Sequence, residues 1–313
     1  MLLSICIPSY NRGHRAYPLV KGLLERCKSD EVEIVLSNNG SDKNTEGYQK
    51  LKEIDDPRFH YYEFAQNMRY WGNYNQVIRK SEGDWCLLLS DEDDIVVDYL
   101  PYYLDMIKNN PGLGVIKAAG DDYPFEQEEY HQRGMEAVKR YFLGGNYISG
   151  AMYNRKIVTN MLVDSLAERY STENEAYYYY PHLFVELYAL LYGDFYCGNL
   201  RLISKGEGIC DQEQHVSKLF TEAAYSTYES RLLQMQGFTD LIADLDESEA
   251  IRLCCFKMVI EKHAMLLCNS RIAMKRQAAQ FMEKQIFNTR SPLIMQNRSD
   301  LSEYIQILIE KLL

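Results

Sequence analysis

The sequence predicts an α/β protein with a mostly parallel central sheet flanked by helices, extended by an all-helical C-terminal region. Short apolar runs alternate with helical patterns up to about residue 210, and small polar clusters follow several of these runs. This alternation predicts strands joined by right-handed helical crossovers, and therefore a parallel sheet. The pattern is then helical to the end. We expect a first domain over residues 1–210 and a helical region over residues 211–313.

The predicted strands are short apolar runs that end at a proline, a glycine or a polar cluster. The first run ends at Pro8, the second leads into an asparagine-rich turn, and the fourth breaks abruptly into aspartates. The predicted strands cover residues 2–8, 32–36, 59–64, 84–89, 114–118, 146–152 and 195–204.

The predicted helices carry apolar residues three and four positions apart, which gathers them on one face. In the first helix these residues are Leu19, Val20, Leu23 and Leu24. The predicted helices cover residues 17–27, 48–54, 74–80, 99–108, 135–142, 158–166 and 180–192. The C-terminal region has wide apolar faces of the same kind, which must be buried against something.

The composition is that of an ordinary globular protein and excludes several classes of function. Hydrophobic residues make up 46% of the chain and charged residues 25%. The formal net charge of −11 argues against nucleic acid as a partner and offers no polybasic attraction to anionic lipid. No stretch approaches the roughly 18–20 apolar residues of a membrane span. The eight cysteines show no CxxC spacing, which argues against zinc sites. We expect a cytoplasmic protein.

Four consecutive acidic residues, Asp91 to Asp94, follow the predicted strand over residues 84–89. Ligands of open α/β sheets bind just beyond the carboxyl ends of strands, so this is a suitable place for a site. The carboxylates repel one another unless a cation, water or a helix N-terminus offsets their charge. A divalent cation held by oxygen ligands is one solution. The alternative is that Asp93 or Asp94 caps a helix that starts near Ile95.

Small polar loops follow three of the predicted strands: SYNRG over residues 9–13, SNNGSD over residues 37–42 and SDEDD over residues 90–94. In a parallel sheet these loops gather at one edge and form a crevice of nucleotide size. The chain has no GxGxxG after its first strand and no GxxxxGK[ST], so neither a Rossmann dinucleotide site nor a P-loop is supported. A metal bridging the phosphates would then supply the positive charge.

With these residues in place, the chain resembles family 2 glycosyltransferases of the Rossmann-like GT-A fold. The resemblance covers roughly residues 2–210 and rests on five motifs in order. They are SICIPSYNR (4–12), EIVLSNNGSD (33–42), NMRYWGNYN (67–75), LLLSDEDDI (87–95) and ISGAMYNRK (148–156). The resemblance implies a metal-dependent, inverting transfer of a sugar from a nucleotide-sugar donor to an acceptor hydroxyl.

The resemblance also implies roles for particular residues. Asp91 and Asp93 match the DxD motif, with Asp93 the expected ligand of Mg²⁺ or Mn²⁺ and Asp91 its companion. Asn75 resembles an asparagine at the end of the family's third-strand loop. The remaining residues implied to bind the nucleotide are Pro8, Tyr10, Asn11, Arg12, Asn38 and Asn39. A UDP-sugar is the favoured donor, but many relatives carry an aspartate in place of Asn38, and asparagine can accept or donate, so the base stays open.

A second departure from the family concerns the catalytic base, because the acidic pair that usually supplies it is not obvious in this sequence. The segment YPHLFVE over residues 180–186 is similar to a subgroup that acts in bacterial surface-polysaccharide assembly. An inverting mechanism needs a base that can reach the acceptor hydroxyl. His182 and Glu186 share one helical face at i, i+4, so either could serve, with Asp121 and Asp122 as rivals.

Other readings stay open from the sequence. A nucleotidyltransferase shares a similar sheet but usually has a glycine- and lysine-rich loop after its first strand, which is SYNRG here. A catalytically silent nucleotide-sugar or glycan-binding protein is the rival from another class. His215 could complete a metal site, although a surface helix residue is favoured. The acceptor would be a glycan or lipid-linked. The C-terminal helices could pack on the first domain, cover the acceptor site, form a homo-oligomer, or rest peripherally on the inner face of the membrane.

Overall fold

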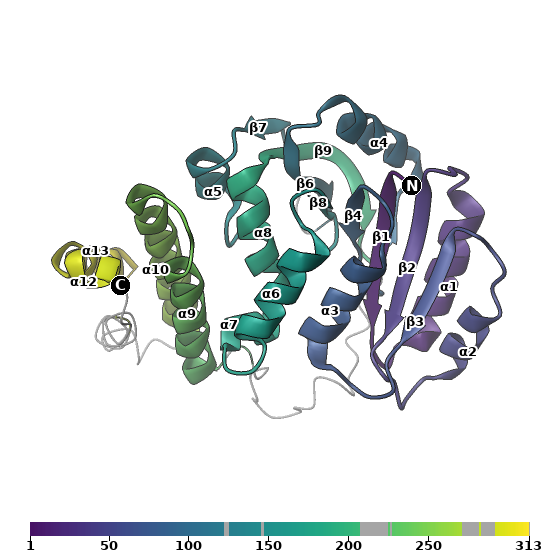
Figure 1. Ribbon diagram of the computed structural model, residues 1–313, viewed down its shortest axis with the longest axis horizontal. Helices are drawn as coiled ribbons and strands as arrows, with labels where there is room; N and C mark the ends of the chain where they lie inside the picture. The colour runs from purple at the N-terminus through teal and green to yellow at the C-terminus, as the bar shows by residue number, and fades with distance from the viewer. Residues whose placement is uncertain are drawn as a thin grey trace. The chain divides into compact units, whose positions relative to one another are not determined.

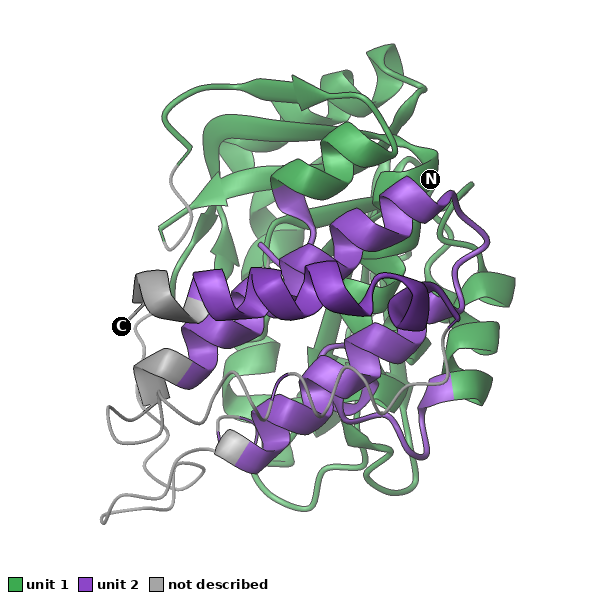
Figure 2. Cartoon of the chain, turned by 90° about the vertical axis from the view of Figure 1, so that its left-hand side faces the viewer, with its two compact units in different colours: residues 1–140, 145–169, 181–208 green, residues 141–144, 170–180, 209–313 purple. Residues whose placement is uncertain are grey.

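The computed structural model describes residues 1–121, 125–144, 147–206, 225, 227–270, 282 and 292–312 of the 313-residue chain. The chain divides into two compact units, coloured separately in Figure 2. The first unit comprises Met1–Arg140, Gly145–Arg169 and Pro181–Gly208, and the second comprises Tyr141–Gly144, Tyr170–Tyr180 and Ile209–Leu313. Among the described residues, no helix is both long enough and apolar enough to cross a membrane.

A mixed, mostly parallel sheet forms the centre of the first unit (Figure 1). In the described residues it has nine strands, in the order β3-β2-β1-β4-β8-β6-β9-β5, with β7 paired to β9. Neighbours β3, β2, β1 and β4 are parallel, whereas β8 runs antiparallel between β4 and β6. The strands are β1 (Leu3–Ser9), β2 (Val32–Asn38), β3 (Phe59–Glu63), β4 (Trp85–Leu88), β5 (Asp94–Ile95), β6 (Leu113–Gly120), β7 (Glu129–His131), β8 (Ala151–Asn154) and β9 (Asp194–Ser204).

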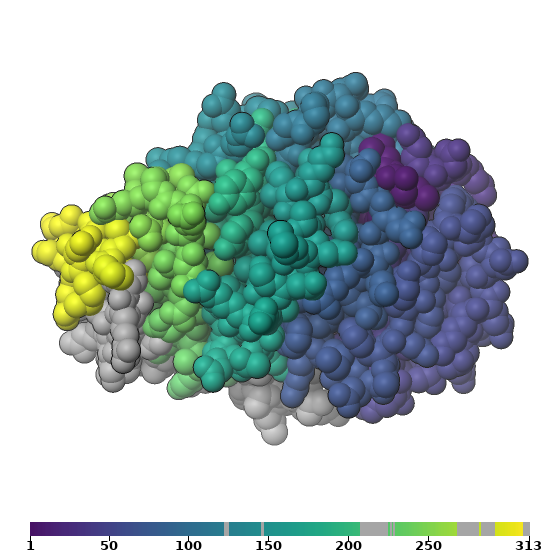
Figure 3. Space-filling view, viewed as in Figure 1, coloured from purple at the N-terminus to yellow at the C-terminus, as the bar shows by residue number. Residues whose placement is uncertain are grey.

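Helices cover both faces of this sheet, which is why its central strands are buried throughout. Ile5 and Ile7 of β1 join the core beneath α1 and α4, while Cys6 points to the other face and lies 3.7 Å from the Val77 carbonyl of α3. Figure 3 shows the α3 and α6 side of the unit with its side chains in place. The helices are α1 (Gly13–Arg26), α2 (Glu46–Lys52), α3 (Arg69–Lys80), α4 (Leu100–Asn109), α5 (Met135–Tyr141), α6 (Asn160–Tyr170) and α8 (Pro181–Tyr192).

The predicted α/β class, the mostly parallel sheet and the C-terminal helices are confirmed, with three local corrections. Asp93 and Asp94 do not cap a helix near Ile95, because Asp94 and Ile95 form β5. A short 3₁₀ helix (Val97–Tyr99) follows, and α4 begins only at Leu100 without a side-chain cap. Helix α3 starts earlier than expected, at Arg69, since Gly72 and Asn73 interrupt the apolar periodicity of its first turns.

The third correction concerns the strand expected over residues 146–152, because β8 begins only at Ala151. Residues 147–150 precede this strand, and Gly150 has φ +84°. A Cβ at Gly150 would lie 2.9 Å from the Ile203 Cγ1 atom and 3.1 Å from the Ala118 carbonyl oxygen. Both the backbone conformation and the close packing therefore require glycine here.

The second unit is helical over its described residues. Its helices are α7 (Glu175–Tyr179), α9 (Tyr228–Ala243), α10 (Glu249–Ser270), α12 (Pro292–Gln296) and α13 (Arg298–Leu312). Asn174 joins two of them, because its Oδ1 accepts from the Tyr177 N–H at 2.9 Å and its Nδ2 donates to the Gly237 carbonyl at 2.9 Å. The first bond caps α7, and the second fixes it against α9.

A buried histidine makes the stability of the second unit sensitive to acid. His263 is fully buried, and this lowers its pKa from 6.5 to about 4. Below pH 6.5 His263 is protonated in the unfolded chain but stays neutral in the folded protein. The free energy of unfolding therefore falls by about 3 kcal/mol as the pH is lowered to 4. We predict that His263→Gln removes this contribution to the loss of stability in acid. Urea unfolding of the wild type and the variant between pH 6.5 and 4 measures it. If the free energy of unfolding depends on pH in the same way in both proteins, the prediction is wrong.

Candidate active site

The three polar loops meet at the carboxyl ends of β1, β2 and β4. Ser9 lies opposite Asn38 in the β1–β2 register, and the Ser9 hydroxyl donates to Asp91 Oδ2 at 2.6 Å. That hydroxyl also lies 2.6 Å from the Tyr48 hydroxyl, which accepts from the Arg12 N–H at 3.0 Å. Since Ser9 has a single proton, Tyr48 must donate to Ser9. A directed chain of hydrogen bonds thus ends on Asp91.

Asp91 is a buried carboxylate with a cationic partner. Its residue is 4% exposed, and burial raises its pKa, while the charge of Arg12 and the Ser9 hydrogen bond oppose that rise. Arg12 Nη1 lies 3.0 Å from Asp91 Oδ1 and also pairs with Glu92. Arg12 therefore neutralises the charge of Asp91 within the chain.

Asn11 and Asn39 fix the loops around Asp91 to one another. Asn11 has φ +57°, and its Oδ1 accepts from the N–H groups of Asp42 and Lys43, both at 3.0 Å. Asn39 Oδ1 accepts from the Met68 N–H at 2.9 Å, at the start of α3. These amides order the loops after β1, β2 and β3.

The Asn38 side chain is also held from several sides. Its Oδ1 accepts from both the hydroxyl and the N–H of Ser41, at 2.5 and 3.2 Å. Its Nδ2 donates to the Tyr61 hydroxyl at 3.1 Å, which itself donates to Glu63 Oε2 at 2.8 Å. Because the Tyr61 hydroxyl donates its proton to Glu63, it can only accept from Asn38, and the NH₂ group of the Asn38 amide must point to it. The amide oxygen already accepts two bonds within the chain.

Asp93 is surrounded differently from Asp91. Its residue is 3% exposed, and its Oδ2 accepts from the hydroxyls of Tyr147 and Ser149, the latter at 2.6 Å. The Ser149 hydroxyl accepts from the Ser90 N–H at 2.9 Å, so its own proton points to Asp93. Asp93 Oδ1 is buried and has no hydrogen-bond partner among the residues that the structure describes.

This bare oxygen fits a divalent cation. An unpaired buried carboxylate oxygen is costly, and Mg²⁺ or Mn²⁺ prefers oxygen ligands. In the part of the chain that the structure describes, no group of three or more His, Cys, Asp or Glu side chains could hold a metal. Asp93 alone would therefore provide a partial site, of the kind that substrate phosphates and water complete.

His182 and Glu186 of α8 are both buried, and Glu186 lies near Tyr153 of β8. They are 3% and 1% exposed, respectively. The His182 ring lies 6.3 Å from the rings of Tyr70 and Tyr74 on α3. Burial raises the pKa of Glu186 well above its usual range, while the charge of Lys117 and the Tyr153 hydroxyl oppose the rise. A carboxyl with a raised pKa is suited to proton transfer near neutral pH.

The other predicted residues are placed less centrally. Asp121 forms an ion pair with Arg201, with Asp121 Oδ1 2.7 Å from Arg201 Nε. Asn75 is buried within α3 and does not sit at the end of a loop, because the helix begins at Arg69. Pro8 and Tyr10 are half-buried where β1 ends. Asp122 and His215 lie outside the described residues.

Sequence reasoning missed the partners of the two aspartates. Ser9 and Ser149 stand inside the motifs quoted above, but no local pattern predicts that they donate to Asp91 and Asp93. Tyr48 and Tyr147 likewise come from distant segments. Lys117 gave a signal, since a single lysine within the apolar run GVIKAA is unusual for a buried strand.

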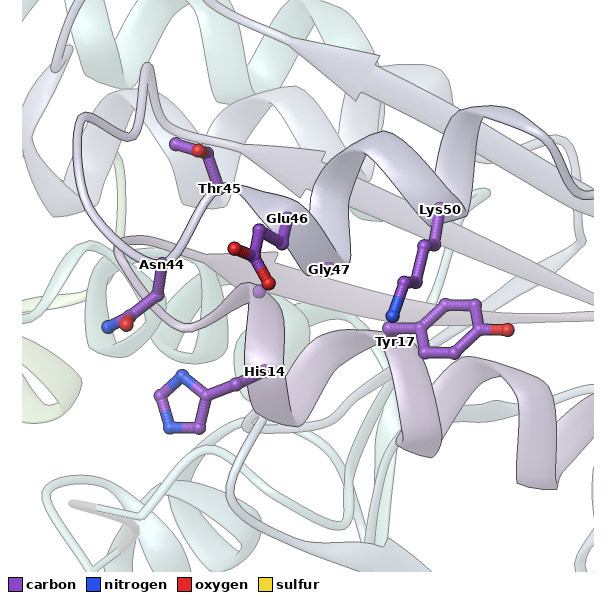
Figure 4. A pocket seen from close by; sticks show the side chains of 8 residues that line it. His14, Tyr17, Asn44, Thr45, Glu46, Gly47 and Lys50 are labelled. Carbon is purple, nitrogen blue, oxygen red and sulfur yellow. The ribbon is translucent and has the colours of Figure 1, made fainter.

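A separate cleft of about 530 Å³ lies between the N-terminal ends of α1 and α2 (Figure 4). Gly13 and Gly47 let the two helices approach, since a Cβ at Gly47 would lie 1.8 Å from the Gly13 carbonyl oxygen. The Lys50 ammonium lies 5.6 Å from the centre of the Tyr17 ring. None of the residues predicted to bind nucleotide lines this cleft, which is lined by Gly13, His14, Tyr17, Asn44, Thr45, Glu46, Gly47 and Lys50.

The family is established by sequence comparison. The model of glycosyl transferase family 2 matches residues 4–164, just over half of the chain. The chain therefore belongs to glycosyl transferase family 2 and is a glycosyltransferase with a GT-A-like fold. No curated protein sequence matches the chain significantly.

Solved structures share this fold at low sequence identity. S. aureus TarS 1-349 in complex with UDP-GlcNAc is 13% identical with a TM-score of 0.66, covering 100% of this chain and 89% of that one. The complex of the same protein with UDP has 12% identity, a TM-score of 0.65 and the same coverage. The mannosyltransferase PcManGT from Pyrobaculum calidifontis, in complex with GDP-Man and Mn²⁺, has 12% identity and a TM-score of 0.50, covering 98% and 85%.

The partners of Asp91 lead to a stability prediction. Arg12→Ala leaves a buried carboxylate without its cation and should lower the free energy of unfolding by about 2–3 kcal/mol. Arg26→Ala is the control, because Arg26 and Asp94 form an exposed ion pair at 2.6 Å. Arg26→Ala should lower the free energy of unfolding by at most about 1 kcal/mol. Urea unfolding measures both, and equal losses would show that Arg12 does not neutralise Asp91.

Proposed function

We propose that the chain is a metal-dependent, inverting glycosyltransferase. It moves a sugar from a nucleotide-sugar donor to a hydroxyl of a glycan or lipid-linked acceptor, in bacterial surface-polysaccharide biosynthesis. One observation supports the metal site: two hydroxyls hold Asp93 Oδ2, while Asp93 Oδ1 is buried and has no partner in the described part of the chain. A carboxylate held in this way presents one oxygen to a cation at the edge where a parallel sheet binds its ligand.

The donor in this proposal is a nucleoside diphosphate sugar, with UDP favoured. Two structures with the same fold hold UDP or UDP-GlcNAc, and a third holds GDP-Man. Because Ser41 already occupies the Asn38 oxygen, a preference for uracil would not rest on Asn38 as an acceptor. Pro8 and Tyr10 would flank the base, while Asn11, Asn38, Asn39 and Asn75 would shape the nucleotide pocket mainly by ordering its loops.

The leaving group in this proposal is a nucleoside diphosphate, whose charge must be stabilised as the glycosidic bond breaks. A bound Mg²⁺ or Mn²⁺ supplies that stabilisation by neutralising the phosphate oxygens. Asp93 would hold the ion through Oδ1. Asp91 would stay paired with Arg12, which limits the negative charge that the diphosphate meets.

The acceptor hydroxyl must lose its proton as it attacks. We place this role on Glu186 or His182, with Asp122 as the remaining candidate. Burial keeps the pKa of Glu186 raised, which brings the carboxylate closer to the basicity that proton abstraction at neutral pH requires. Asp121 is the weaker rival, because Arg201 already binds both of its oxygens.

The organisation of the chain is part of the proposal. Residues 1–210 would form the catalytic domain and residues 211–313 a helical region that serves acceptor binding or self-association. The protein would act in the cytoplasm, where a lipid-linked acceptor would be met at the inner face of the membrane. Its net charge of −11 gives no reason to include nucleic acid.

Thermal shift with nucleotides and metal tests the site. A ligand that binds only the folded state raises the midpoint, so UDP with Mn²⁺ should raise it more than UDP or Mn²⁺ alone. Asp93→Asn should abolish this extra rise and sugar transfer. Its own midpoint should stay close to that of the wild type, because asparagine keeps an oxygen that can accept from the hydroxyls of Tyr147 and Ser149.

The outcomes of this experiment are distinct. GDP and CDP, each with Mn²⁺, show whether another base is preferred. An Asp93→Asn protein that transfers sugar normally would refute the metal role. Failure of every nucleotide to shift the wild type would instead favour a binding protein for another ligand.

The catalytic base is tested by Glu186→Gln. If Glu186 accepts the proton, turnover should fall about a hundredfold or more, with little change in donor affinity. Steady-state kinetics separates the two effects. Asp121→Asn is the matched control and should retain most of its turnover, because Asp121 is engaged by Arg201. Unchanged turnover of Glu186→Gln would transfer the role to His182 or Asp122.

A further inference from the structure

Lys117 is a buried cation in the middle of the sheet. It belongs to β6, whose residues are all buried, and it is 1% exposed. Burying an ammonium group is costly unless it is paired and hydrogen-bonded, and this cost lowers the pKa of Lys117 to about 8. An apolar residue would fit the strand pattern better, so the lysine calls for a specific reason.

The Lys117 ammonium binds the segment that holds Asp93. Its Nζ donates to the carbonyl oxygens of Tyr147 at 2.8 Å and Ser149 at 2.7 Å. The side-chain hydroxyls of the same two residues donate to Asp93 Oδ2. One cation thus anchors the backbone of both residues that orient the proposed metal ligand.

We propose that Lys117 is a positioning residue for the metal site: by fixing the backbone of residues 147–149, it holds the two hydroxyls against Asp93 Oδ2 and directs Asp93 Oδ1 to the cation. This inference rests on the proposed metal-dependent function. Lys117 does not itself contact metal or substrate, and acts through Tyr147 and Ser149.

The backbone around residues 147–149 explains why a cation is needed there. This segment precedes β8, whose pairing with β4 and β6 begins only at Met152 and Ala151. At its end, the Gly150 N–H donates to the Leu88 carbonyl at 3.0 Å, and the Gly150 carbonyl accepts from the Ala118 N–H at 2.9 Å. The Lys117 ammonium supplies the donors for the Tyr147 and Ser149 carbonyls of this segment.

The charges nearby balance that of Lys117. The carboxylates of Glu186 and Asp93 act on Lys117 from the protein interior and favour its charged form. Lys117 also lowers the cost of keeping Glu186 ionised. The same buried cation therefore links the proposed metal ligand to the proposed catalytic base, two groups on different elements.

Calorimetric titration of UDP-loaded protein with Mn²⁺ tests the inference. Lys117→Met should weaken Mn²⁺ binding about tenfold or more, as loss of an outer partner of a metal ligand does. Binding of UDP without metal should not change, because the nucleotide loops are untouched. Lys117→Arg keeps a cationic donor and should recover part of the Mn²⁺ affinity.

Val115→Ala is the matched control for lost packing. Val115 is buried two residues earlier on the same strand, on the same side, and does not bond residues 147–149. It should lower thermal stability and leave Mn²⁺ affinity unchanged. Equal losses of Mn²⁺ affinity in Val115→Ala and Lys117→Met at comparable stability would reduce Lys117 to a packing residue and overturn the inference.

A second variant covers the case in which Lys117→Met does not fold. Lys117→Met combined with Glu186→Gln removes both members of the buried pair and avoids an isolated charge. It should lose Mn²⁺ affinity relative to Glu186→Gln alone; equal affinity would overturn the inference. A wild type that binds UDP without any response to Mn²⁺ would refute the proposed metal site, whereas a responsive wild type with an unaltered Lys117 variant refutes only the role of Lys117.

Discussion

The cost of removing two neighbouring carboxylates from water shapes this end of the sheet. Asp91 and Asp93 follow β4 directly and are 4% and 3% exposed. Arg12 and a directed chain of hydroxyls offset the charge of Asp91, whereas one oxygen of Asp93 has no partner within the described residues. Two similar side chains, two residues apart, thus have different surroundings: Arg12 neutralises Asp91, whereas Asp93 is the residue that we propose as the metal ligand.

The loops around these aspartates owe their order to amides and hydroxyls that bind one another. Asn11 and Asn39 bind neighbouring backbone groups, and Asn38 is held between Ser41 and Tyr61. Loops held by such bonds need less ordering when a ligand binds, which lowers the entropic cost of binding. Asn11, Asn38 and Asn39, which the family motifs imply as nucleotide-binding residues, therefore also hold the loops of this chain together.

A buried polar layer lies between the sheet and α8. Lys117 on β6 and Glu186 on α8 are both 1% exposed, and each reduces the cost of charging the other. Such groups are expensive to bury, and in some proteins they fix one arrangement among several. Here the arrangement fixed is that of the segment holding Asp93, so the interior electrostatics and the proposed metal site are parts of one network.

Local patterns in the sequence determined the fold class, the convergence of three polar loops and the position of Asp91 and Asp93, because strand and helix periodicity and a run of carboxylates are readable within a few residues. The tertiary structure alone decided what surrounds them. Tyr147 and Ser149 reach Asp93 across sequence separations of 54 and 56 residues, and Lys117 reaches the Ser149 carbonyl across 32. No local signal records such contacts, since they depend on which strands become neighbours and where β8 begins. The burial of His182 and Glu186 was likewise decided by packing, as an i, i+4 spacing defines a helix face but not what covers it.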